Sequence, residues 1–226
     1  MENLLSKFQN FAVVCAGYHI SPNFFDGMFQ VSPKYINEST NLIHHDENNY
    51  KIQNVEDDDP ILVSRKEWGA LNPKRAPGNL TISPPKWVVF SHTATPPCFI
   101  EKDCLVQVKL IQKLCVESKG WGNVGFNFLV GGDGNVYEGL GWGVEGARTK
   151  PFNPKSLGIA LIGDFQNMRP TDAQLDATKK FLEYAVEQNQ LDPNYKIIVQ
   201  RQVIVTNSPG RMAYQIIRTW DRWTPL

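Results

Sequence analysis

The chain has 226 residues, 42% of them apolar, and its 23 basic residues are balanced by 23 acidic ones. That composition can fill one substantial core, so we expect one folded domain. No run of about 18 apolar residues is present, so we expect no membrane-spanning helix, and the basic residues are too scattered to indicate a nucleic-acid partner.

Residues 1–60 differ in composition from the rest of the chain. They contain three Lys and nine Asp or Glu, which leaves 20 basic and 14 acidic residues in 61–226. They show no sustained apolar period and end in Asp57-Asp58-Asp59-Pro60. We therefore expect an acidic, poorly ordered arm at 1–60, with a short signal-like apolar run within residues 1–16, before a modestly basic domain at 61–226.

The domain begins with signals for a strand and a helix. Residues 87–91 form a short apolar run flanked by proline pairs, which is typical of a buried strand. A helix is predicted from near Asp103 to Gly120, because apolar residues recur there at a spacing of three or four.

The next segment predicts a hairpin and a central strand. Asp133-Gly134 separates two strand-like runs within 126–139, and a tight turn at this point needs the positive φ that Gly adopts freely. Residues 157–162 are fully apolar, as in a strand that is covered on both faces.

A long helix and a short strand are predicted to follow. Thr171 and Gln174 have the spacing of a capping box, and the apolar stripe behind them predicts a helix that Asp192-Pro193 stops. Residues 197–199 then predict another buried strand.

The last predicted element is a helix with Ser208 as its N-cap and Pro209 in its first turn, running as far as Trp220. Strands that alternate with helices, together with one hairpin, indicate an α/β fold. We expect a mixed central β-sheet flanked by about three helices.

Four separated motifs carry a resemblance to a known family. They are Trp-Val-Val-Phe-Ser-His-Thr at 87–93, Phe-Asn-Phe-Leu-Val-Gly-Gly-Asp-Gly at 126–134, the apolar strand at 157–165 and Ser-Pro-Gly at 208–210. Together they resemble the peptidoglycan recognition proteins, whose domain is similar to that of phage-type (type 2) amidases, over roughly residues 61–226.

The resemblance implies that a zinc centre has been lost. Catalytic members hold Zn²⁺ with two His and one Cys, and the ion polarises the amide that joins muramic acid to the stem peptide and activates water. By motif, the matching positions are Ser91, Gln200 and Ser208, and Phe126 stands where catalytic members have a Tyr. The resemblance thus implies a non-catalytic member without a metal or other cofactor.

The residue types support the same interpretation. Of the four His, only His92 lies in 61–226, and neutral Ser and Gln oxygens are weak ligands for zinc. Ser91 and His92 are neighbours on a predicted strand, so their side chains point to opposite faces and cannot form a nucleophile–base pair.

In the family, the stem peptide lies in a groove on the sheet beside the first long helix. The resemblance carries this role to nine positions, which are His92, Thr93, Cys115, Lys119, Gly120, Trp121, Phe126, Arg148 and Asn153. Other roles stay open, because His92, Trp121 and Phe126 also suit a core, and Lys119 also suits a helix C-terminus.

Two features bear on the type of stem peptide. Gly120-Trp121 resembles the pair in members that prefer diaminopimelate-type over lysine-type peptides. Those members also have an Arg at the position of Leu140, so another residue has to supply that charge. Our hypothesis is that Arg148 or Lys119 does so, since a guanidinium grips a carboxylate through two hydrogen bonds.

The resemblance also implies a disulfide between Cys98 and Cys104. A cystine argues for an oxidising compartment, and with the signal-like run it favours secretion from the cell. A cytoplasmic sensor with reduced thiols is the alternative.

The sequence thus predicts a non-catalytic pattern-recognition receptor that binds bacterial peptidoglycan fragments and triggers innate immune signalling, through a protein partner or through ligand-induced self-association. Two alternatives stay open. One is a zinc-dependent N-acetylmuramoyl-L-alanine amidase of the same fold, and the other is a regulatory or decoy member that contacts proteins only.

Overall fold

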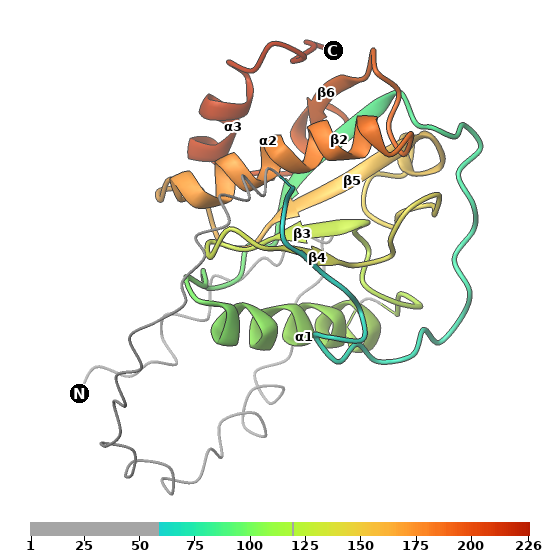
Figure 1. Ribbon diagram of the computed structural model, residues 1–226, viewed down its shortest axis with the longest axis vertical. Helices are drawn as coiled ribbons and strands as arrows, with labels where there is room; N and C mark the ends of the chain where they lie inside the picture. The colour runs from blue at the N-terminus through green and yellow to red at the C-terminus, as the bar shows by residue number, and fades with distance from the viewer. Residues whose placement is uncertain (1–58, 119) are drawn as a thin grey trace, which may run out of the picture. The chain divides into compact units, whose positions relative to one another are not determined.

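The computed structural model describes residues 59–118 and 120–226 (Figure 1). Nearly all of the predicted arm, with its signal-like run, and Lys119 lie outside these residues. In the described part, a six-stranded sheet has α1 on one face and α2 and α3 on the other, which confirms the predicted mixed sheet with three helices. None of the helices in this part is long and apolar enough to cross a membrane.

The sheet has the strand order β1-β4-β3-β5-β2-β6. In chain order the strands are β1 (Leu62–Val63), β2 (Trp87–His92), β3 (Phe128–Val130), β4 (Val136–Glu138), β5 (Ser156–Leu161) and β6 (Lys196–Val199). β3 and β4 form the predicted antiparallel hairpin, and the other neighbouring pairs are parallel. The apolar strand β5 lies between β3 and β2, with both neighbours hydrogen-bonded to it, as expected for a central strand.

Two apolar clusters cover the two faces of the sheet. α1 (Glu101–Glu117) buries Val108 and Ile111 in one cluster, while α2 (Asp172–Glu187) and α3 (Arg211–Ile217) cover the other. Successive residues of β5 alternate between them, since Ile159 lies in the cluster under α2 and Ala160 in the cluster under α1. The strand has no polar face because neither of its faces meets water.

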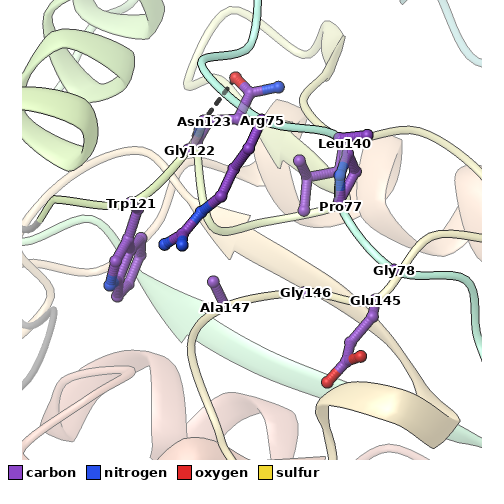
Figure 2. Close-up of a pocket in the computed structure, with 12 residues that line it drawn as sticks. Arg75, Pro77, Gly78, Trp121, Gly122, Asn123, Leu140, Glu145, Gly146 and Ala147 are labelled. Carbon is purple, nitrogen blue, oxygen red and sulfur yellow. Dashed lines mark hydrogen bonds between the residues drawn. The ribbon is translucent and has the colours of Figure 1, made fainter.

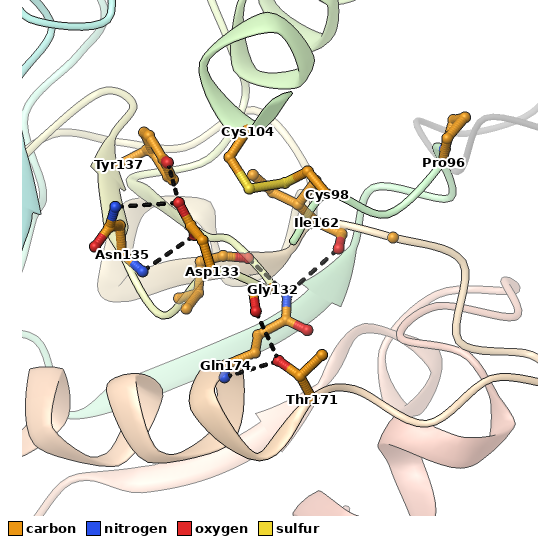
Figure 3. The surroundings of a disulfide bond; sticks show 12 residues. Pro96, Cys98, Cys104, Gly132, Asp133, Asn135, Tyr137, Ile162, Thr171 and Gln174 are labelled. Atoms are coloured by element: carbon orange, nitrogen blue, oxygen red, sulfur yellow. Dashed lines mark hydrogen bonds between the residues drawn. A yellow bond between two sulfur atoms is a disulfide. The ribbon is translucent and has the colours of Figure 1, made fainter. Parts of the chain in front are cut away.

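The Cys98–Cys104 disulfide joins the loop after β2 to the first turn of α1, with Cα atoms 5.0 Å apart (Figure 3). It packs directly on the hairpin turn, because a Cβ on Gly132 would lie 2.3 Å from Cys98 O. Within that turn the Tyr137 hydroxyl donates to Asp133 Oδ2 at 2.6 Å. The turn predicted from Asp133-Gly134 is therefore stabilised by the Asp133 carboxylate and covered by the disulfide.

The start of α2 keeps one half of the predicted capping box. Thr171 Oγ1 accepts a hydrogen bond from Gln174 N at 3.1 Å, as expected for an N-cap. The Gln174 side chain does not return to the cap, because its amide donates to Val130 O at 2.7 Å in the sheet. It ties α2 to β3 instead.

The predicted cap of the last helix is wrong. α3 begins at Arg211 and ends at Ile217, short of Trp220. Ser208 does not cap it, because its Oγ accepts a hydrogen bond from His92 N at 3.1 Å, at the end of β2. The Ser208 hydroxyl, which the sequence pattern assigned to the helix cap, therefore makes a long-range contact instead.

A buried arginine fixes the loop from β4 to β5. Arg148 is 5% exposed, and its guanidinium lies against Gly158 of β5, where a Cβ would be 1.6 Å from Arg148 Cζ. Its Nη2 donates to Ser156 Oγ at 3.2 Å and its Nη1 to Asn127 Oδ1 at 3.5 Å. No carboxylate in the described part of the chain forms an ion pair with it. Burial lowers the pKa of Arg148 to about 9.

His92, at the end of β2, is buried and neutral. Its Nδ1 accepts a hydrogen bond from Phe165 N at 3.2 Å, so that nitrogen carries no proton. Burial lowers the pKa of His92 to about 4, with Arg201 adding to the shift and Asp164 opposing it. The Asp164 carboxylate is 3.8 Å from Nδ1, but against a neutral ring it makes no ion pair at pH 7.

Gly158→Ala should destabilise the domain by about 1–3 kcal/mol, because the added methyl would overlap the Arg148 guanidinium. Urea unfolding of the parent and the variant measures this cost. In an Arg148→Ala background the same substitution should cost less than about 0.5 kcal/mol, since the overlap is gone. An equal cost in both backgrounds would contradict the packing.

The free energy of unfolding should fall by roughly 3 kcal/mol between pH 7 and pH 4 through His92 alone. The unfolded imidazole, with a pKa near 6.5, takes up a proton in this range, whereas the buried ring stays neutral down to about pH 4. The contribution is therefore complete above pH 6.5 and is lost as the pH falls. Urea titrations at a series of pH values should show a flatter slope for His92→Gln, and identical slopes would rule out the imidazole as the source.

Candidate functional site

The three positions that match zinc ligands lie together at one end of the sheet. Phe90 of β2 and Val199 of β6 are opposite each other in the sheet. Ser91 and Gln200 come directly after these two residues, so they are neighbours across the two strands. Ser208 joins them through the hydrogen bond from His92 N. All three side chains are buried, and the fold brings Ser91 together with two residues that lie more than 100 positions later in the sequence.

The donor set at this point does not fit zinc. Gln200 Nε2 donates to Arg148 O at 2.7 Å, which leaves only neutral hydroxyl and amide oxygens. Ser91 Oγ and Gln200 Oε1 are buried without a protein hydrogen-bond partner. Zinc in proteins prefers imidazole and thiolate, and residues 59–118 and 120–226 contain no cluster of three His, Cys, Asp or Glu that could hold an ion.

His92 and Thr93 brace the loop after β5. His92 holds Phe165 N, as described above, and Thr93 Oγ1 accepts from Gly163 N at 3.0 Å. The hydroxyls of Thr93 and Thr95 share a further hydrogen bond of 2.8 Å. His92 Nε2 carries the ring proton and has no protein partner in the described part of the chain.

Three other predicted groove residues are enclosed. Cys115 and Phe126 belong to the cluster under α1, and Phe126 is 1% exposed. Asn153 Oδ1 accepts from Arg148 N at 3.2 Å and from Thr149 N at 2.7 Å, which holds the loop between β4 and β5 in shape. All three side chains are buried, and none of them lines the pocket described below.

The structure gives no support to a direct role for Arg148 in holding a ligand carboxylate. Its guanidinium lies under the backbone, with Gly146 and Gly158 both too close to accept a side chain of their own. Lys119, the other residue expected to supply a charge, is outside the described residues.

A pocket of about 390 Å³ opens beside Trp121 (Figure 2). Three segments line it, namely residues 75–78, residues 121–124, and Leu140 with residues 145–147. Trp121 forms one wall, and its ring packs on Gly125, where a Cβ would lie 2.1 Å from the ring. Gly120 precedes this wall with φ +63°, which favours glycine as the helix gives way to the loop.

Arg75 and Glu145 are the charged residues of the pocket, and the sequence interpretation missed both. Neither belongs to a motif, and Lys74-Arg75 lies in a Pro-containing loop that gave no sign of its position in space. The pocket depends on three segments that are remote in sequence. The available signal was a pair of adjacent cations before β2, which alone does not identify a site.

Comparison with known proteins gives the same fold and family. A family model described as N-acetylmuramoyl-L-alanine amidase matches residues 82–213. Peptidoglycan-recognition protein 2 of Holotrichia diomphalia is 43% identical over 165 residues, covering 73% of this chain and 87% of that protein. Peptidoglycan-recognition protein SC2 of Drosophila melanogaster is 38% identical over 164 residues, covering 72% and 87%.

Solved structures agree. The ectodomain complex of peptidoglycan recognition proteins LCa and LCx with bound tracheal cytotoxin matches with a TM-score of 0.71 and 40% identity, covering 73% of this chain and 98% of that chain. Peptidoglycan recognition protein-LE, in complex with tracheal cytotoxin described as monomeric diaminopimelic acid-type peptidoglycan, matches with a TM-score of 0.71 and 37% identity, covering 73% and 96%. By its amidase-type domain, its sequence identities and its fold, the chain belongs to the peptidoglycan recognition proteins.

Proposed function

We propose that this protein is a non-catalytic pattern-recognition receptor that binds bacterial peptidoglycan fragments by their stem peptide and triggers innate immune signalling. Family membership supports the ligand class. Three of the similar structures contain tracheal cytotoxin, and for one of them it is described as diaminopimelic acid-type. Binding needs a shaped cleft with a few placed polar groups, and that requirement does not include a metal.

The residue types at the three positions that match metal ligands support the proposal that the protein is not catalytic. Ser91, Gln200 and Ser208 converge, and two of them use their side chains in hydrogen bonds to the backbone. None has a thiolate or an imidazole with which to hold zinc. Phe126, where catalytic members have a Tyr, has no hydroxyl to donate to a reacting carbonyl. The residues present therefore offer neither suitable ligands for the Lewis acid nor the hydrogen-bond donor of the amidase reaction.

We further propose that the protein acts outside the cell and signals through a protein partner or through ligand-induced association. The Cys98–Cys104 cystine supports an oxidising compartment. The complex of two recognition proteins with tracheal cytotoxin is a precedent for ligand-linked association among similar structures. Recovery of Cys98 and Cys104 as reduced thiols from the native source would contradict the extracellular placement and favour a cytoplasmic sensor.

The purified protein should contain less than about 0.1 zinc per chain and should release no stem peptide from muropeptides, because its donor set is neutral. Elemental analysis and chromatography of the digest check this, and isothermal titration with diaminopimelate and lysine muropeptides should show binding. Chelator-sensitive hydrolysis would identify a zinc amidase instead. Silent titrations with both ligands would favour a decoy that contacts proteins only.

The combined variant Ser91→His, Gln200→His and Ser208→Cys should bind one zinc ion per chain, because the fold already brings these positions together. Its affinity should exceed that of a control with Ser208→Ala in place of Ser208→Cys by at least about a hundredfold, as the control offers only two ligands. Metal-competition titration with a chromophoric chelator measures both. A folded triple variant that takes up no zinc would mean that the three positions do not converge on one point.

A further inference from the structure

An exposed asparagine begins the triplet Asn79-Leu80-Thr81, in the loop before β2. Asn-X-Thr with X other than Pro is the acceptor pattern for an N-linked glycan, and such a site has to lie at the surface of the protein. Asn79 and Thr81 are both exposed. The other triplet of this kind in the chain, Asn37-Glu38-Ser39, lies outside the described residues.

The Asn79 side chain forms no hydrogen bond within the described part of the chain, unlike several other asparagines there. The amides of Asn123, Asn127 and Asn135 are buried and hydrogen-bonded. A substituent on any of those three nitrogens would break bonds that hold the fold. Asn79 can take a substituent on its amide nitrogen at no such cost.

The backbone directs Asn79 away from the pocket beside Trp121. Gly78 and Glu145 both line this pocket, and they lie next to each other, because Glu145 N donates to Gly78 O at 2.8 Å and a Cβ on Gly78 would lie 3.2 Å from Glu145 Oε2. The next pair, Asn79 and Val144, forms an antiparallel bridge. Since successive side chains of an extended segment point to opposite faces, Asn79 points away from the face that Gly78 and Glu145 share.

The groups that fix the triplet come much later in the chain. Thr81 Oγ1 donates to Pro154 O at 2.9 Å, across 73 positions, and Leu80 N donates to Gly143 O at 2.9 Å. During synthesis, the triplet is therefore made before its partners, and a transferase can reach it before the loop is fixed. In the folded chain Asn79 is still at the surface, so the fold has room for the product.

We propose that Asn79 carries an N-linked glycan, on the face of the loop opposite the pocket. In the transfer, Asn79 Nδ2 forms a bond to the anomeric carbon of an oligosaccharide that is carried on a lipid diphosphate. The bond from that carbon to the diphosphate oxygen breaks, the lipid diphosphate leaves with the electron pair, and the amide nitrogen gives up one proton. The proposal rests on the extracellular placement proposed above, because N-linked glycans belong to secreted and surface proteins.

The test is mass spectrometry of the full chain carrying Asn37→Gln, secreted from insect cells behind a cleavable signal peptide. Asn79 should carry a glycan in most chains, and peptide-N-glycosidase should remove it, convert Asn79 to Asp and raise the mobility of the chain on a gel. The further substitution Asn79→Gln should abolish this change in mobility. A secreted, folded chain with an unmodified Asn79 would overturn the proposal and leave the extracellular placement intact.

Thr81 provides a matched pair of variants. Thr81→Ser keeps the hydroxyl that the acceptor pattern requires and should retain the glycan, whereas Thr81→Ala should lose it although Asn79 is unchanged. Loss of the glycan in neither variant would mean that the sugar is attached independently of the triplet, and would contradict the assignment.

The protein from its native source separates this proposal from the compartment. Oxidised Cys98 and Cys104 with an unmodified Asn79 would overturn the glycan alone. Reduced Cys98 and Cys104 with an unmodified Asn79 would contradict the extracellular placement and, with it, the glycan on the native protein.

The direction of the glycan is tested by titration. Removal of the glycan should change the affinity for a diaminopimelate muropeptide by less than about twofold, because Asn79 points away from the pocket. Isothermal titration of the secreted chain before and after peptide-N-glycosidase measures this. Binding that becomes more than about tenfold tighter after removal would place the sugar over the pocket and overturn the assigned direction.

Discussion

The close approach of the Arg148 guanidinium to the backbone of β5 is the constraint that holds the β4–β5 loop, and residues 145–147 of this loop line the pocket beside Trp121. A buried cation without a carboxylate is costly, and it persists only where hydrogen bonds and packing compensate. Ser156 and Asn127 supply those bonds, and Gly158 supplies the space. The backbone carbonyl of Arg148 accepts a hydrogen bond from the Gln200 side-chain amide. The side chain and the carbonyl of Arg148 therefore couple the β4–β5 loop to the residue before β3, to β5 and to the residue after β6.

The same part of the structure contains the three positions that match metal ligands, and their residue types determine what they can bind. In this region, the positions that match metal ligands carry no negative charge, and the nearby loop contains a buried guanidinium. A divalent cation would meet weak neutral ligands there instead of a thiolate. The fold itself does not depend on those positions, because the two clusters that cover the sheet are built from other side chains. The proposed absence of a bound metal is therefore compatible with retention of the fold.

The regular elements could be predicted from the sequence where their signals are local. The turn at Asp133-Gly134, the Thr171 cap and the unbroken apolar run of β5 each depend on residues within a few positions. β1, with two residues, is too short to show a period.

The site was less predictable, because its contacts are long-range. The sequence around Ser208 matches a helix cap, but in the folded chain its hydroxyl accepts a hydrogen bond from His92 N at the end of β2. Gly158 resembled an ordinary strand residue, and nothing near Arg148 in sequence indicates that its guanidinium would be enclosed there. Arg75 is exposed and lies in no motif, so only the folded chain shows it beside Trp121. Motifs locate residues that a family shares, whereas charges supplied from a loop become apparent only from their place in space.

The arrangement of charges in the described part of the chain is compatible with the proposed receptor without catalysis. An amidase concentrates positive charge at the floor of its cleft, on an ion that acts on the scissile bond. Here Arg148 is buried against the backbone of β5, and the charged residues that line the pocket are Arg75 and Glu145, on the loops around it. Charges at a rim can distinguish the ends of ligand side chains without reaching the amide bond. Because backbone hydrogen bonds hold both loops, substitution at these positions can change the charge of the pocket without disturbing either apolar cluster.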